Sequence, residues 1–136
     1  MAPLLADIIR LAKMSKAATL YIAVVDDDEH VCRSLGRLLR AAGMQPITYH
    51  SAEEFLADKK HPQFDCLILD VHLGEMSGIE LGQRLVAEGR QAPFICITAQ
   101  EDPGTRALAE AAGCAAFFRK SDSGAAVLEA IRRVAL

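Results

Sequence analysis

The chain has 136 residues, of which 51% are hydrophobic and 24% charged, a composition typical of one globular domain and not of a disordered chain. A formal net charge of −3 at pH 7 disfavours direct binding to nucleic acid, which requires a basic surface. No apolar stretch approaches the ~20 residues that a membrane-spanning helix needs, so no membrane association is expected.

The cysteines are scattered along the chain. They stand at positions 32, 66, 96 and 114 and include no C-x-x-C pair. This spacing favours buried free thiols over a disulfide or a zinc site. Free thiols in turn favour a cytoplasmic location.

Residues 1–19 precede the regular pattern of the rest of the chain. Apolar residues at helical spacing are interrupted there by Asp7, Arg10 and Lys13. The segment lacks the basic start and the unbroken apolar core of a signal peptide. It is an upstream extension, with Met14 as an alternative start, a remnant of cloning, or an amphipathic helix that docks on the domain or on a partner. We prefer the first two interpretations.

The first half of the domain begins with an apolar run at residues 20–25, which predicts a strand buried on both faces. Apolar residues then recur at helical spacing up to Ala42, and Gly43 supplies a stop. A short strand is expected over 45–49. A short helix to about Asp58 follows it.

The start of that short helix carries its own signal. Ser51 stands at the expected N-cap, and Glu54 follows three residues later. Because each side chain can bond the backbone N–H of the other residue, this spacing predicts a capping box.

The second half continues the alternation of strands and helices, which implies a parallel sheet with helices on both faces. Right-handed crossovers leave few topologies, and we expect an α/β flavodoxin-like (βα)5 sandwich with strand order 2-1-3-4-5. The remaining elements are predicted as a strand at 64–70, a helix at 78–88, a strand at 93–98, a helix at 103–112, a strand at 115–118 and a helix at 123–136.

Polar side chains gather where the predicted strands end. They are Asp26, Asp27 and Asp28 after the first strand, Asp70 at the end of the third, Thr98 at the end of the fourth and Lys120 just past the fifth. In an open α/β sheet, ligands bind beyond these carboxyl ends. The clustered carboxylates would repel one another without a cation, and their hard oxygens suit Mg²⁺. With a hydroxyl and an ammonium beside them, they can build a site for phosphoryl transfer to a carboxylate.

The motifs at these strand ends are Val24-Val25-Asp26-Asp27, Leu67-Ile68-Leu69-Asp70, Met76-Ser77-Gly78-Ile79-Glu80-Leu81, Ile97-Thr98-Ala99 and Phe117-Phe118-Arg119-Lys120. Together and in this order they resemble the CheY-like receiver domain of two-component response regulators. Spacings of 43 residues from Asp27 to Asp70, 28 onward to Thr98 and 22 onward to Lys120 fit that family. The resemblance covers residues 20–136.

The resemblance implies a role for each matching acid. Asp70 would be the phosphoacceptor, which takes a phosphoryl group from a phosphohistidine of a sensor histidine kinase or of a phosphotransfer protein. Asp26, Asp27 and Asp70 would hold Mg²⁺, or Mn²⁺ in its place. The backbone carbonyl of His72 would complete the protein ligands of that ion.

The resemblance also implies a switch. Thr98 and Lys120 would contact the phosphoryl oxygens, and Phe117 would turn inward when Thr98 moves, although a plain core aromatic is left open at this position. His72 and Gln100 stand where the family tunes the lifetime of the phosphate. The signal would leave through the last two helices and the strand between them, toward a downstream protein target or an output domain.

Three positions need a separate account. Asp28 falls one past the matched pair, and we expect it to cap the following helix, where an acid contributes ~0.3–1 kcal/mol, in preference to a metal ligand. Ser121 stands where the family usually has a cis proline; a cis bond here costs ~2.5–4 kcal/mol, so the bond is trans or a strained cis. Gly74 also replaces a usual proline and should loosen its loop.

The leading hypothesis is a phosphoacceptor signalling domain, not an enzyme, apart from self-phosphorylation by small donors and slow autodephosphorylation. One alternative is a receiver-fold interaction module that works without phosphate. Another is a phosphatase of the haloacid-dehalogenase type, whose D-x-D motif occurs at residues 26–28 but whose later acidic pair is missing. Because nothing follows Leu136, we expect a single-domain regulator unless the chain is a piece of a longer protein.

Overall fold

The computed structural model describes residues 4–6, 19–90 and 92–135. Most of the predicted N-terminal extension therefore lies outside the described residues, and of its apolar positions Leu4 and Leu5 are exposed. A search of the described helices finds none with the length and apolar character needed to cross a membrane.

Five parallel strands form one sheet in the order β2-β1-β3-β4-β5, which confirms the predicted topology. All residues of β3 and β4 are buried, as expected for central strands covered on both faces. Because the strands are parallel, their carboxyl ends share one edge of the sheet. The strands are β1 (Tyr21–Val25), β2 (Gln45–Tyr49), β3 (Cys66–Asp70), β4 (Phe94–Thr98) and β5 (Ala116–Arg119).

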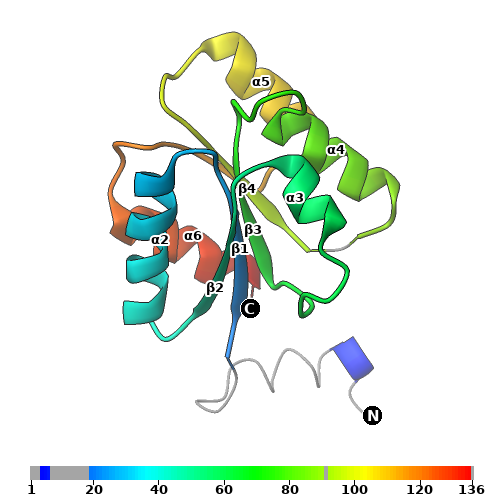
Figure 1. Cartoon of the computed structure of the whole chain (residues 1–136), viewed down its shortest axis with the longest axis vertical. Helices are drawn as coiled ribbons and strands as arrows, with labels where there is room; N and C mark the ends of the chain where they lie inside the picture. Colours follow the sequence, from blue (N-terminus) through cyan, green and yellow to red (C-terminus); the bar gives the residue numbers. More distant parts are fainter. Residues whose placement is uncertain (1–3, 7–18, 91, 136) are drawn as a thin grey trace.

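Helices cover both faces of the sheet (Figure 1). Side chains alternate along each strand, so Ile22 and Val24 pack toward one pair of helices while Ala23 and Val25 pack toward the other three. One face carries α2 (Glu29–Ala41) and α6 (Gly124–Ala135), and the other carries α3 (Ala52–Ala57), α4 (Gly78–Ala87) and α5 (Pro103–Ala111). Each predicted element is present, with ends that shift by at most two residues.

Three helices end at a glycine, and the first of these glycines, Gly43, is the predicted stop. Gly43, Gly89 and Gly113 follow α2, α4 and α5 and have φ values of +80°, +76° and +100°. Glycine adopts this left-handed conformation without the steric cost that a Cβ brings.

The starts of two helices differ from the expectation. Ser51 caps α3 by accepting a hydrogen bond from the N–H of Glu54, but the Glu54 carboxylate accepts from the N–H of His50 instead of that of Ser51. The predicted hydrogen bond from the N–H of Ser51 to the Glu54 side chain was therefore wrong, because the donor is the preceding residue. A complete capping box occurs at the start of α4, between Ser77 and Glu80.

Candidate functional site

The carboxyl edge of the sheet brings the predicted acids together. Val25 and Leu69 are partners in the pairing of β1 with β3, so Asp26 and Asp70 follow at the same level. Asp26, Asp27 and Asp70 each offer a carboxylate oxygen within 4.8 Å of the others. Asp26 is 0% exposed and Asp70 2%, whereas Asp27 is exposed. Two of the three acids are thus held away from bulk water.

A single amine joins the two buried acids. The Nζ atom of Lys120 lies 2.9 Å from Oδ2 of Asp26 and 3.3 Å from Oδ2 of Asp70. Burial lowers the pKa of Lys120, but the hydrogen bonds to Asp26 and Asp70 and their negative charges outweigh it, so that the pKa is raised. The amine therefore stays a cation across the physiological range.

The same surroundings act in the opposite direction on Asp70. Burial first, and then the negative charge of Asp26, raise the pKa of Asp70 above the ordinary value of an aspartate, while Lys120 and the N–H of His72 oppose the rise. Two buried carboxylates thus share one ammonium group. A second cation would relieve the repulsion between them.

The structure also contains an oxygen suited to such a cation. Oδ2 of Asp26 is buried and accepts no hydrogen bond from any residue that the structure describes. The amine of Lys120 lies within ion-pair distance of this oxygen, but its hydrogen bond to Asp26 is made with Oδ1, at 3.1 Å. Because Mg²⁺ is bound by carboxylate oxygens and the three acids bring theirs within 4.8 Å of one another, they fit a divalent cation.

Asp28 caps α2, as predicted. Oδ1 of Asp28 accepts hydrogen bonds from the N–H groups of His30 and Val31, at 2.9 and 3.4 Å. The N–H of Asp28 in turn donates to Oδ1 of Asp26, at 2.8 Å. The Cys32 thiol, which sequence reasoning treated only as a buried hydrophobe, donates to the backbone oxygen of Asp26 at 3.2 Å. Burial raises the pKa of this thiol to about 11.

Thr98 is the last residue of β4, and His72 and Gln100 follow the ends of β3 and β4 at the same edge of the sheet. Thr98 is fully buried, and its hydroxyl donates to the backbone oxygen of Gln100 at 2.8 Å. The N–H of His72 donates to Oδ1 of Asp70 at 3.2 Å. The side chains of His72 and Gln100 are exposed.

Phe117 lies in the core beneath α5, 8% exposed. The guanidinium carbon of Arg106 lies 5.4 Å from the centre of its ring, a cation–π arrangement. Arg106 also pairs with Glu101 and Glu110. Sequence reasoning did not single out Arg106, because an arginine on the polar face of a helix carries no signal of its own. A switching role for Phe117 stays a prediction.

Two backbone features complete the site. Among the described residues no peptide bond is cis, so the bond from Lys120 to Ser121 is trans, the first of the two predicted states. At the start of α4, a Cβ on Gly78 would collide with the backbone oxygen of Asp70. The close approach of α4 to the strand that carries Asp70 therefore requires glycine at this position.

Comparisons with known proteins agree with this architecture. The family model for the response regulator receiver domain matches residues 22–132. The chain is 37% identical over 122 residues to the response regulator protein TodT of Pseudomonas putida, covering 90% of this chain and 53% of TodT. It is 32% identical over 114 residues to the transcriptional regulatory protein FixJ of Azorhizobium caulinodans, covering 84% and 54%. The chain thus spans about half the length of the curated relatives it matches.

Solved structures show the same fold. The crystal structure of FixJ-N superimposes with a TM-score of 0.77 at 32% identity, covering 85% of this chain and 93% of that one. A CheY-like receiver domain protein from Methanospirillum hungatei gives a TM-score of 0.79 at 24% identity, covering 87% and 94%, and at this identity supports the fold alone. Since the family model covers most of the chain and the strand order agrees, this protein belongs to the receiver domain family of two-component response regulators.

Proposed function

We propose that this receiver domain accepts a phosphoryl group on Asp70 from a phosphohistidine of a sensor histidine kinase or of a phosphotransfer protein. The observation that carries the proposal is the buried pair of Asp26 and Asp70 joined by the amine of Lys120. An oxygen of Asp70 forms the bond to phosphorus, while the bond from phosphorus to the imidazole nitrogen of the donor breaks.

The divalent cation of this proposal is Mg²⁺, or Mn²⁺ in its place. Asp26, Asp27, Asp70 and the backbone carbonyl of His72 would hold it, and the close approach of the three carboxylates supports this ligand set. When bound, the ion supplies positive charge that neutralises the carboxylates and the phosphoryl oxygens. Lys120 provides a second positive charge and exchanges a carboxylate partner for a phosphoryl oxygen.

The switch begins at Thr98. Its hydroxyl would leave the carbonyl of Gln100 and donate to a phosphoryl oxygen, and the ring of Phe117 would follow into the space that opens. We propose that this movement changes the surface of α5, β5 and α6, which a downstream protein or an output domain reads. The exposed side chains of His72 and Gln100 would set how easily water reaches the phosphate.

The proposal assigns residues 20–136 to the receiver domain and residues 1–19 to an extension. It includes no direct contact with nucleic acid. All cysteines in the described residues are free thiols, which supports the predicted cytoplasmic location.

The test is phosphorylation by a small donor. Acetyl phosphate with Mg²⁺ should add one phosphate, detected by mass spectrometry of the intact protein, and a chelator should prevent the addition. Asp70→Asn should take up none, whereas Asp65→Asn, which lies just before the opposite end of the same strand, should react like the original chain. If Asp70→Asn accepted phosphate equally well, the assignment of the acceptor would be wrong.

The same reaction separates this proposal from a module that works without phosphate. Beryllofluoride with Mg²⁺ imitates an acyl phosphate and should shift the backbone NMR signals of α5, β5 and α6. Signals that stay unchanged in these elements, while Asp70 is saturated, would support the phosphate-independent module instead.

A further inference from the structure

The turn that carries Lys120 is closed by Asp122. The N–H of Asp122 donates to the backbone oxygen of Arg119 at 2.9 Å, which places Lys120 and Ser121 at the centre of a four-residue turn. The carboxylate of Asp122 then folds back, and its Oδ2 accepts from the N–H of Arg119 at 2.8 Å. One residue therefore holds both backbone groups of Arg119.

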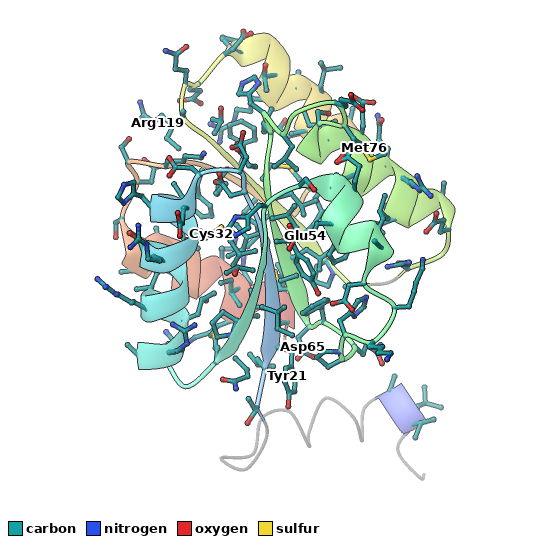
Figure 2. All side chains as sticks on the ribbon, viewed as in Figure 1. Tyr21, Cys32, Glu54, Asp65, Met76 and Arg119 are labelled. Carbon is teal, nitrogen blue, oxygen red and sulfur yellow. The ribbon has the colours of Figure 1, made fainter. Side chains whose placement is uncertain are left out.

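This closure matters because β5 is an edge strand that pairs only with β4. The N–H of Lys120 points inward and donates to the oxygen of Thr98 at 2.7 Å. The N–H of Arg119 points outward, where the sheet provides no acceptor, and Asp122 supplies one. Figure 2 shows Arg119 at this end of the molecule, opposite Tyr21 and Asp65.

Apart from the bond of the Lys120 N–H to Thr98, which ties the turn to the sheet, no further backbone hydrogen bond of this turn is found among the described residues. The bond between Lys120 and Ser121 is trans, and serine leaves the backbone free to adopt other conformations. Oδ1 of Asp122 lies 3.7 Å from Nε of Arg119, but that arginine is 53% exposed, and exposed ion pairs contribute little. Beyond the sheet, the conformation of the turn is therefore held by the two hydrogen bonds of Asp122 to Arg119, one from its N–H and one to its carboxylate.

We infer that Asp122 is a positioning residue for Lys120: by closing the turn, it directs the amine between Asp26 and Asp70. The inference rests on the proposed function, in which that amine receives phosphoryl oxygens. A lysine side chain is long and flexible, so the direction in which it leaves the backbone determines which positions its amine occupies.

Asp122 positions Lys120 through the geometry of its hydrogen bond and not through its charge. Oδ2 acts only as an acceptor for one N–H group, and the amide oxygen of asparagine can accept the same bond. Glutamate keeps the charge but moves the carboxylate by one methylene group. Asparagine should therefore replace Asp122, and glutamate should not.

The experiment compares rates of phosphorylation by acetyl phosphate with Mg²⁺ in the full chain. Asp122→Ala and Asp122→Glu should lower the rate by about tenfold, because small misplacements of a charged group are costly, and Asp122→Asn should stay within about twofold. Ser51→Ala is the matched control, since it also removes one side-chain bond to a backbone N–H but in α3. It should leave the rate unchanged.

A second arm tests whether Asp122 acts through Lys120. In a Lys120→Ala background, Asp122→Ala should lower the rate no further; an equal loss in both backgrounds would overturn the inference. A low phosphorylation rate in Asp122→Asn together with a normal rate in Asp122→Glu would also overturn it, because Asp122 would then act through its charge. If the original chain itself took up no phosphate, the proposed function would fail, whereas a normal rate in both Asp122→Ala and Asp122→Glu would remove this inference alone.

Discussion

The acidic site formed by Asp26, Asp27, Asp70 and Lys120 differs in kind from the aromatic cluster formed by Tyr49, Phe55, His61 and Phe64 beside α3. In the cluster, Tyr49 and Phe55 meet edge to face at 5.2 Å between ring centres, and His61 stacks on Phe64 at 4.7 Å. Such pairs add ~0.5–1.5 kcal/mol to the effect of burial itself. The cluster therefore stabilises the fold.

The acidic site has the opposite effect. Its two buried carboxylates share one ammonium group, and burying charge costs free energy even when the charge is paired. Removing a side chain should therefore weaken the fold in the cluster, whereas removing one of the two buried negative charges should strengthen it in the site. The residues that stabilise the domain are therefore different from those proposed to react. Four measurements test this difference.

The largest expected effect is in the cluster. Phe55 is 2% exposed, so Phe55→Ala should lower the free energy of unfolding by ~3–5 kcal/mol in urea titrations. Phe55→Leu, which keeps much of the volume, should lose less. Phosphorylation by acetyl phosphate should persist in the folded fraction of both variants. If a fully folded Phe55 variant lost phosphorylation, the two regions would not be independent.

The next effect joins packing to the site. Gly78→Ala places a Cβ against the backbone oxygen of Asp70, and overpacking of this kind costs ~1–3 kcal/mol. Phosphorylation should fall with it, because the acceptor strand has to shift. Gly74→Ala is the matched control: nothing lies within 4 Å of the added Cβ, so urea titration should show equal or higher stability. Equal behaviour of the two variants would contradict the close approach.

A gain in stability is expected within the acidic site. Asp26→Asn keeps an acceptor for Lys120 and for the N–H of Asp28 but removes one buried negative charge. The free energy of unfolding in chelator should rise by about 1 kcal/mol, while the affinity for Mg²⁺ in a titration followed by NMR should drop. A variant that is less stable in chelator would mean that the buried charge is not a cost.

The smallest effect is a pH dependence at the rim of the cluster. The Tyr49 hydroxyl donates to Oδ2 of Asp58 at 2.6 Å and lowers the pKa of Asp58. A lowered pKa means that this contribution is present above the ordinary aspartate value of 3.8 and is lost as the pH falls through the folded value. The difference in unfolding free energy between the original chain and Tyr49→Phe should therefore narrow from about pH 6 to about pH 3. A constant difference would assign the effect of Tyr49 to packing alone.

The location of the acidic site could be predicted because the end of each strand is marked in the sequence by the end of an apolar run. The length of each apolar run determined that Asp26, Asp70 and Thr98 come at a carboxyl end, and the parallel order placed those ends together. Asp28 could be separated from its neighbours since it precedes a helix, where a cap is needed. The predicted strand order needed no contact information beyond this alternation.

The contacts that the sequence did not predict depend on how turns direct side chains across space. Asp122 closes a turn around Lys120, and Arg106 covers Phe117 from another element; neither position differs in pattern from an ordinary surface residue. The sequence of Ser77 to Glu80 has the pattern of a capping box, but it was interpreted only as part of a family motif. The state of the Lys120–Ser121 bond required the backbone itself.

One feature of the site offers a way to observe it without a label. The Cys32 thiol donates to the backbone oxygen of Asp26, and the stretching vibration of an S–H group responds to the strength of its hydrogen bond in a part of the infrared spectrum that few protein groups occupy. Cys32→Ser would identify the band by its disappearance. The native chain thus contains a vibrational probe in contact with Asp26, which follows the strand paired with that of the proposed phosphoacceptor. Its frequency can follow the site through a cycle of phosphorylation and hydrolysis.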